Sequence, residues 1–320
     1  MGGRVGRLIV RRLLSLIPML ILLSFGIFML TQLIPGDPAV ELAGGINATP
    51  QRVEEIRKEL GFDKPLVTQY FDWAKKAVKL DFGKSLTDKR PVTDSLRNRL
   101  PVTASIVFWA IVFGLCVGLP VGLLAGMRPG SVGDRGSIFF TNLGIAIPNF
   151  VLAMVLITFL AVKQKLFPAI GFKRLTDAGV GPWFRSCFLP SVSLSVIVAA
   201  TMARQLRSAL SDVMLGNYVR TAWAKGAPLS RVVGKHALKN AAIAPVTVLG
   251  FIIAGLLGGS VIIENLFSIP GLGAYLSNAA RSKDMPVIQG VAVMFVLIYV
   301  FIGFVLDVTY GFLNPKIRVQ

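Results

Sequence analysis

The sequence predicts an all-α integral membrane protein with six transmembrane helices, because hydrophobic residues dominate it and its charges are unevenly spread. Of its 320 residues 54% are hydrophobic and 16% are charged, whereas a soluble domain carries about 25% charged residues. A helix of about 20 apolar residues spans the hydrocarbon core of a bilayer. Six charge-free runs fit that role, the fourth being the shortest: Leu13–Ile34, Val102–Met127, Ile138–Val162, Phe188–Ala203, Ala241–Ile263 and Met285–Leu306.

The formal net charge of +18 is concentrated on one side of the predicted membrane. Four arginines and no acidic residue precede the first span, and further basic clusters lie between the second and third spans, between the fourth and fifth, and after the sixth. The short loops on the other side carry fewer basic residues. The long first loop is left out of this comparison, because long segments cross a membrane largely regardless of charge. This positive-inside pattern predicts cytoplasmic termini and explains the basic balance without a nucleic-acid partner.

The spans divide the chain into four segments. Residues 1–34 hold a cytoplasmic N-terminus and the first helix, and residues 35–99 form a small helical extracytoplasmic segment. Residues 100–313 form a core of helices 2–6, which includes a long cytoplasmic loop at residues 213–240, and residues 314–320 are a cytoplasmic tail. The first apolar run exceeds the roughly 7–15 residues of a signal-peptide core, so we expect it to be retained as an anchor.

The extracytoplasmic segment contains start and stop signals for two helices. Thr49 followed by Pro50 is typical of a helix N-terminus, and Gly61 is typical of a helix end. A second helix starts at Pro65 and places its apolar residues opposite three lysines. Two interpretations remain open: an amphipathic helix lying on the outer membrane surface, or part of a dock for an extracytoplasmic partner.

The second span carries a stripe of small residues on one helical face. Its members recur at every fourth position: Gly114, Gly118, Gly122 and Gly126. Small residues at that spacing let two helix backbones approach closely in lipid, where van der Waals packing drives association. The stripe predicts either a tight internal helix contact or an interface with another subunit. Pro120 lies in the same run and is expected to kink the helix.

The spans offer no constellation of catalytic or metal-ligating residues. Glu264 and Asp307 lie near the ends of spans five and six, and Arg204 and Arg207 extend span four. Such charges either snorkel to the headgroups or face an aqueous pathway, and none of them identifies a substrate site. The lone histidine, His236, has no cysteine or carboxylate cluster beside it that could bind a metal. The sequence also contains no G-x-x-x-x-G-K-[S/T] phosphate loop, so we expect no ATPase or other enzymatic activity in this chain.

The loop between spans four and five has the pattern of an ordered helix–turn–helix elbow. Residues 214–225 can continue as helix from span four, with Gly226 as the C-cap and Pro228 preventing simple continuation. Ser230 can cap a second helix, on which Arg231, Lys235 and Lys239 fall on one face. A short, rigid and basic elbow suits a contact with a soluble partner. The alternative is a solvated connector whose lysines face lipid headgroups.

The elbow also carries a family resemblance. Residues 218–226 (YVRTAWAKG) and 236–241 (HALKNA) resemble the coupling loop of ABC-importer permeases of the dipeptide/oligopeptide/nickel branch, in particular the first ("B") permease of dipeptide transporters. Further motifs similar to that family run along the chain in the same order: PGDP at 35–38, LGFDKP at 60–65, DFGKS at 81–85, FSIPGLG at 267–273, and the terminal pattern from Asp307 to Arg318. Trp223 departs from the family's usual arginine, Asn217 from its acidic residue and Asn314 from its aspartate.

The resemblance implies a type I ABC-importer permease fold in a bacterial or archaeal cytoplasmic membrane. It implies a second homologous permease subunit, two ABC ATPase subunits that bind ATP and Mg²⁺, and an extracytoplasmic substrate-binding protein, all embedded in or docked on membrane lipid. The coupling elbow would then lie in a groove of the ATPase, with Gly226 at its turn. The residues that the resemblance places there are Tyr218, Arg220, Thr221, Ala222, Lys225, Gly226, Arg231 and His236.

Substrate identity stays open at this point. Import of di- and oligopeptides is the main interpretation, and import of nickel, opines or glutathione by the same architecture is the alternative. An ion-coupled secondary carrier belongs to a different class, and it would show internal repeats and discontinuous helices around buried ion-binding groups. The sequence shows no convincing repeat.

Overall fold

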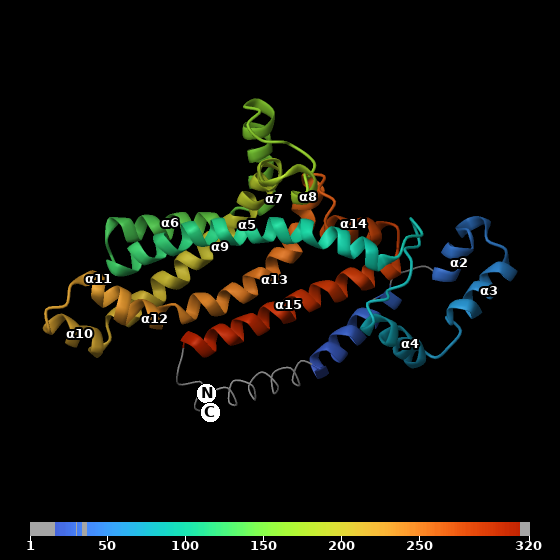
Figure 1. The fold of residues 1–320 in the computed structure, drawn as a ribbon, viewed down its shortest axis with the longest axis horizontal. Coiled ribbons are helices and arrows are strands. Elements are labelled where there is room, and N and C mark those ends of the chain that lie inside the picture. Colours follow the sequence, from blue (N-terminus) through green and yellow to red (C-terminus); the bar gives the residue numbers. More distant parts are fainter. Residues whose placement is uncertain (1–16, 30, 34–36, 314–320) are drawn as a thin grey trace. The chain divides into compact units, whose positions relative to one another are not determined.

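The computed structural model describes residues 17–29, 31–33 and 37–313 (Figure 1). Among these residues the structure is helical, with a single isolated antiparallel bridge between Lys84 and Pro91. The chain divides into two compact units, one formed by residues 1–100 with 275–300 and the other by residues 101–274 with 301–320.

Four helices of the described chain are long and apolar enough to cross a membrane: α5 (Val92–Met127), α9 (Val180–Met214), α13 (Ile243–Leu266) and α15 (Met285–Leu313). They overlap predicted spans two, four, five and six. The first predicted span begins and ends outside the described residues, within which an apolar helix covers Ile17–Met29. The all-α membrane fold is thereby confirmed.

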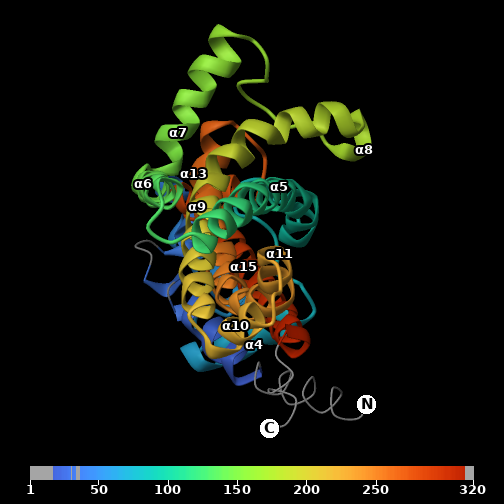
Figure 2. The same cartoon turned by 90° about the vertical axis from the view of Figure 1, so that its left-hand side faces the viewer.

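The predicted third span, Ile138–Val162, is not one straight helix. It is a broken pair, α6 (Val132–Ala146) followed by α7 (Asn149–Leu156) and the π-helix η2 (Ile157–Lys163), bent by 93° (Figures 1 and 2). Pro148 explains the break, because a proline disfavours helical backbone at the residue before it. Ile147 accordingly has extended backbone angles. The sequence predicted a span here from the absence of charge, and the structure shows that the helix is broken within it, which hydropathy alone does not register.

The helix α9 lies at the centre of the second unit, in contact with α6, α7 and α13. At 35 residues it extends well beyond the predicted fourth span at both ends. Arginines near both ends had limited the charge-free run to Phe188–Ala203, and the helix continues through them. The short helix α8 (Leu175–Ala178) precedes it, and α14 (Leu272–Arg281) follows α13.

The four stripe glycines of α5 lie against α9. An added Cβ would come within 2.5 Å of the Ala199 carbonyl oxygen at Gly118, and within 2.6 Å of the Ala203 carbonyl oxygen at Gly122. At Gly114 it would meet the side chain of Val198 at 2.4 Å, and at Gly126 the backbone of Arg207 at 3.0 Å. Glycine is the residue that lets these two backbones come so close.

Residues 37–91, which we call the inter-span segment, contain short helices that pack within the first unit. Thr49 caps α3 by accepting the N–H of Arg52 at 3.4 Å, and Gly61 ends that helix with φ of 72°, which confirms both predicted boundaries. Tyr70 of α4 is buried against Phe25 and Phe28 of the first helix. The segment's helices are α2 (Pro38–Ala43), η1 (Gly45–Asn47), α3 (Pro50–Leu60) and α4 (Leu66–Val78).

Two sets of polar contacts join other parts of this unit to the start of α15. The buried carboxylate of Asp284 accepts hydrogen bonds from the Ser85 hydroxyl at 2.6 Å and from the backbone N–H groups of Leu86 and Thr87 at 2.9 and 3.2 Å. Gln289 donates to the hydroxyl of Thr31 at 2.8 Å. We call the Asp284 contacts the Ser85–Asp284 clasp. It gives the DFGKS motif a structural role, because that motif ends in the clasp serine.

Candidate functional site

The predicted elbow forms a compact hairpin of short helices at the end of α9 (Figure 1). The expected continuous helix from Met214 to Lys225 is wrong, since α9 ends at Met214 and a new helix starts after Gly216. The expected cap at Ser230 is also wrong, because Pro228 takes the position before the next helix and Ser230 lies inside it. The elements are α10 (Asn217–Ala224), α11 (Leu229–Arg231), the π-helix η3 (Val232–Ala237) and α12 (Leu238–Ala241).

Gly226 closes α10 in a Schellman turn. Its N–H bonds to the Trp223 carbonyl at 2.8 Å, and the N–H of Ala227 bonds back to the Ala222 carbonyl at 3.2 Å. Gly226 has φ of 76°, in the left-handed region that favours glycine, and a Cβ there would meet nothing within 4 Å. The requirement for glycine at this position is therefore conformational within this chain.

An apolar cluster holds the elbow on α9. From α9 come Leu206, Leu210 and Met214, and from the elbow come Val219, Val232, Val233, Ala237 and Ala241, all buried. Leu210, Val219 and Val232 are fully inaccessible to solvent. Ala222, one of the predicted coupling residues, is half-buried against this cluster.

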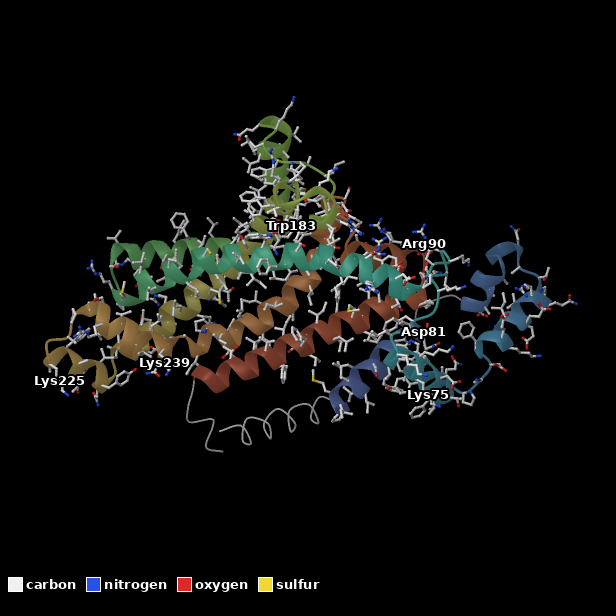
Figure 3. The ribbon with its side chains drawn as sticks, viewed as in Figure 1. Lys75, Asp81, Arg90, Trp183, Lys225 and Lys239 are labelled. Atoms are coloured by element: carbon white, nitrogen blue, oxygen red, sulfur yellow. The ribbon has the colours of Figure 1, made fainter. Side chains whose placement is uncertain are left out.

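The outward side of the elbow is polar and aromatic. Tyr218 and Trp223 are 45% and 46% exposed. Of the predicted coupling residues, Arg220, Thr221, Lys225, Gly226 and Arg231 are exposed as well. Figure 3 shows Lys225 and Lys239 on this part of the molecule. The amide of Asn240 donates to the Tyr218 hydroxyl at 3.2 Å, which joins the two arms of the elbow.

Two further expectations concerned the alignment of the basic residues in the second arm of the elbow and the position of His236. The predicted alignment of Arg231, Lys235 and Lys239 assumed an α-helix, but η3 is a π-helix whose wider turn shifts that register. His236 is part of η3, and its side chain is outside the part of the chain that the structure describes.

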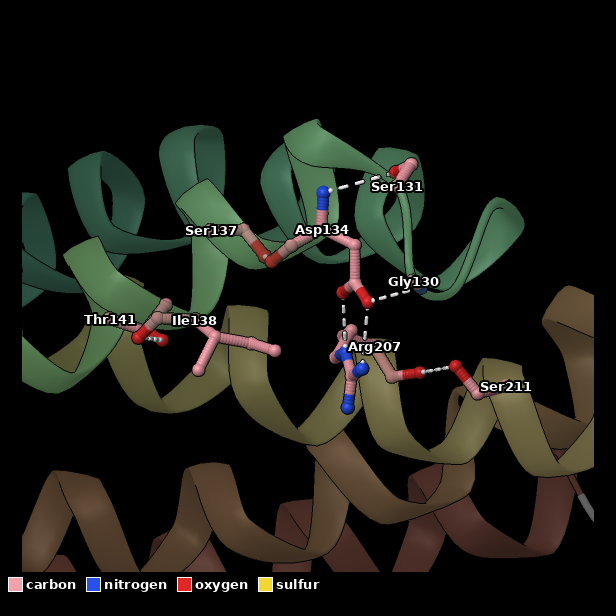
Figure 4. Close-up of polar contacts among 8 residues, drawn as sticks. All are labelled: Gly130, Ser131, Asp134, Ser137, Ile138, Thr141, Arg207 and Ser211. Carbon is pink, nitrogen blue, oxygen red and sulfur yellow. Dashed lines mark hydrogen bonds and ion pairs between the residues drawn. The ribbon is translucent and has the colours of Figure 1, made fainter.

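A partly buried ion pair joins α9 to α6 about one turn before Leu210 (Figure 4). Arg207 donates from Nε and Nη2 to the two carboxylate oxygens of Asp134 on α6, at 2.7 and 2.9 Å. The N–H of Gly130 adds a third hydrogen bond to that carboxylate at 2.8 Å, and Ser131 caps α6 by accepting the Asp134 N–H at 3.2 Å. Asp134 is only 2% exposed. This bidentate geometry fixes the start of α6 to α9 next to the elbow.

Comparisons with known proteins identify the family. Residues 118–319 match the model of the binding-protein-dependent transport system inner membrane component, and residues 5–107 match the N-terminal model of such membrane components. The chain belongs to this family. It is 38% identical over 313 residues to a probable peptide ABC transporter permease protein of Sinorhizobium fredii, covering 98% of this chain and 99% of that protein.

Other relatives of this transport family are similarly close. A putative peptide transport system permease protein of Brucella abortus is 36% identical over 311 residues, covering 97% of this chain and 98% of that protein. A glutathione transport system permease protein of Escherichia coli strain K12 is 38% identical over 316 residues, covering 98% and 99%. The permease fold also matches an inward-facing structure of the MetNI methionine ABC transporter, with a TM-score of 0.56, 22% identity, and coverage of 69% of this chain and 96% of that chain.

This family member also buries a carboxylate for which the sequence left two alternatives, the headgroups or an aqueous pathway. Glu264 on α13 is fully buried, and its carboxylate accepts hydrogen bonds from the Thr103 hydroxyl at 2.6 Å and from the Ala274 N–H at 2.8 Å. Thr103 in turn accepts the N–H of Leu272 at 2.8 Å. Snorkelling is therefore wrong for Glu264, which instead holds the FSIPGLG loop at the start of α14. The side chain of Asp307 lies outside the described part.

Proposed function

We propose that this permease imports peptides and that its elbow docks on a separate ATPase subunit. The observation that carries the proposal is the construction of the elbow, with exposed aromatic and basic side chains on an apolar base that is buried against α9. An exposed aromatic side chain such as Trp223 suits a contact in a groove of a partner. The peptide assignment is supported by relatives from Sinorhizobium fredii and Brucella abortus that are described as peptide permeases.

The complete transporter would contain a second permease, two ATPase subunits that bind ATP and Mg²⁺, and an extracytoplasmic binding protein. The termini and the elbow would be cytoplasmic and the inter-span segment extracytoplasmic, as the distribution of basic residues favours. Closure of the ATPases on ATP would push the elbow. The apolar cluster would then pass this movement to α9, and the Arg207–Asp134 pair would pass it to α6.

A second candidate substrate is glutathione. It is favoured by the permease of Escherichia coli, which is as similar to this chain as the peptide permease of Sinorhizobium fredii. Transport assays with radiolabelled dipeptide and radiolabelled glutathione, using the same reconstituted complex, separate the two.

The test of coupling is the Gly226→Asp variant in a reconstituted complex. A side chain at φ of 76° strains the turn and widens the tip of the elbow, so docking on the ATPase weakens. We expect normal membrane insertion, loss of transport, and loss of ATPase stimulation by the loaded binding protein. The matched control is Gly44→Asp, which also has positive φ and open space around its Cβ but lies in the inter-span segment. Transport at the wild-type rate by Gly226→Asp would refute the coupling role.

A further inference from the structure

A cavity of about 800 Å³ lies within the first unit, between the inter-span segment and the start of α15. Small-molecule and peptide sites typically fall between about 300 and 1,000 Å³. The aromatic side chains of Phe28, Phe62 and Trp73 line it, together with residues of the DFGKS motif. None of the functional assignments above uses this cavity.

Outside its ion pairs, the cavity wall carries more positive charge than negative charge. Asp37 pairs with Arg57, and Asp72 pairs with Lys64 at 2.9 Å. The hydrogen bond from Lys64 lowers the pKa of Asp72, and the charges of Lys75 and Lys76 lower it further. Asp81 already accepts the N–H of Gly83 at 3.0 Å.

Three lysines remain exposed on the cavity wall, and they enter none of the ion pairs found among the described residues. They are Lys76 on α4 and Lys84 and Lys89 in the loop before α5. Two of the three carboxylates of the wall, Asp37 and Asp72, are in ion pairs with described residues, whereas none of its three lysines is, so the wall has an excess of positive charge that favours anionic groups. The amino group of a free zwitterionic peptide would find little unengaged negative charge there.

The cavity wall and the exposed apolar stripe are on opposite faces of α4, which favours a soluble partner over a lipid as the occupant of the cavity. Val67, Phe71 and Val78 form an apolar stripe on α4 and are 62%, 57% and 85% exposed. A stripe of this kind on an amphipathic helix belongs at the membrane. At 3.6 residues per turn Lys76 lies about 140° from Phe71 and about 180° from Val67, so the cavity wall is on the face of α4 that points away from the stripe.

We propose that this cavity docks an acidic protrusion of the extracytoplasmic binding protein, an inference that rests on the proposed function because that function supplies the partner. Carboxylates of the protrusion would bind Lys76, Lys84 and Lys89, and its apolar atoms would pack on Trp73 and Phe62. The Ser85–Asp284 clasp connects the cavity to the start of α15. Ser85 and Leu86 line the cavity and bond directly to Asp284, so an occupant presses on the loop that holds the start of α15.

The test compares two neighbouring charge reversals in the complete complex in lipid nanodiscs. Lys76→Glu changes the cavity wall, and Lys75→Glu changes an exposed lysine of the same helix that does not line it. Both variants alter the net charge equally, so long-range steering changes to a similar extent. The measurement is the Kd with which the loaded binding protein binds the complex. The binding protein used is the one that stimulates ATP hydrolysis by the wild-type complex. We expect Lys76→Glu combined with Lys84→Glu to weaken binding by about 10-fold or more, with a weaker salt dependence. The charge-matched double control, Lys75→Glu combined with Lys79→Glu, reverses two exposed lysines that do not line the cavity and should change the Kd by less than about 2-fold.

A photo-crosslinking residue in place of Lys89 identifies the occupant. Crosslinking to the binding protein that is abolished by Lys76→Glu supports the dock. A wild-type Kd for the double variant, or crosslinking only to phospholipid or to labelled peptide, overturns it. These failures leave the proposed function standing if the wild-type complex still transports peptide, whereas a wild-type complex without transport refutes the function itself.

Discussion

The elbow and the inter-span segment are both short helical excursions between spans, yet they are attached to their units by different contacts. The elbow is held on α9 by a cluster of aliphatic side chains around Leu210 and Val232. The inter-span segment packs Tyr70 on the first helix, but its end is held at the start of α15 by directed hydrogen bonds to Asp284. Each attachment is buried.

The difference suggests different mechanical roles. Apolar attraction is non-directional, so the elbow can tilt on its base without losing its attachment. Hydrogen bonds to a carboxylate depend on distance and angle, so the Ser85–Asp284 clasp allows one register only. On this account the elbow is built to move under load, and the inter-span segment is built to move together with α15.

The largest expected difference in unfolding free energy is between two substitutions of nearly the same shape, one in each attachment. Asp284→Asn keeps the volume but removes the negative charge that strengthens the hydrogen bonds from Ser85, Leu86 and Thr87, which should cost about 2–3 kcal/mol of unfolding free energy. Leu210→Met keeps the volume of a fully buried aliphatic residue and should cost less than about 1.5 kcal/mol. Unfolding of the purified chain in mixed micelles measures both. Equal costs would remove the contrast between the two attachments.

A smaller effect is expected where neither kind of attachment is involved, in the contact between α5 and α9. Gly122→Leu forces a side chain against the backbone of Ala203 and should cost about 1–3 kcal/mol through overpacking. Gly255→Leu on α13 is the control, because an added Cβ there meets nothing within 4 Å. The same unfolding assay compares them. If Gly122→Leu unfolds like the wild type, the two helices are not in tight contact in the folded protein.

Local patterns in the sequence were enough to predict the helices and several of their ends. Charge-free length indicated α5, α9, α13 and α15, and the Thr49-Pro50 and Gly61 signals gave both ends of α3. Pro148 is a visible signal for the break between α6 and α7, but the prediction from charge-free length did not use it.

The polar contacts could not be predicted in this way, because their members are far apart in the chain. Asp134 and Arg207 are 73 residues apart, Thr103 and Glu264 are 161 apart, and Ser85 and Asp284 are 199 apart. Periodicity describes only neighbours on one helix, so it does not show which distant partner neutralises a charge. For the same reason the sequence left Glu264 open between the headgroups and an aqueous pathway, and Asp134 was not singled out at all.

The most direct test of the account is a crosslink from the tip of the elbow. On a background in which Cys116 and Cys187 are replaced, Lys225→Cys is joined to a bifunctional maleimide photo-crosslinker in the assembled complex, and Lys79→Cys on the inter-span segment is the control. Both lysines are exposed. The account predicts that Lys225→Cys crosslinks to the ATPase subunit and that Lys79→Cys does not. Absence of that crosslink in a complex that transports at the wild-type rate, or labelling of Lys225→Cys by an impermeant thiol reagent in intact cells, would contradict it.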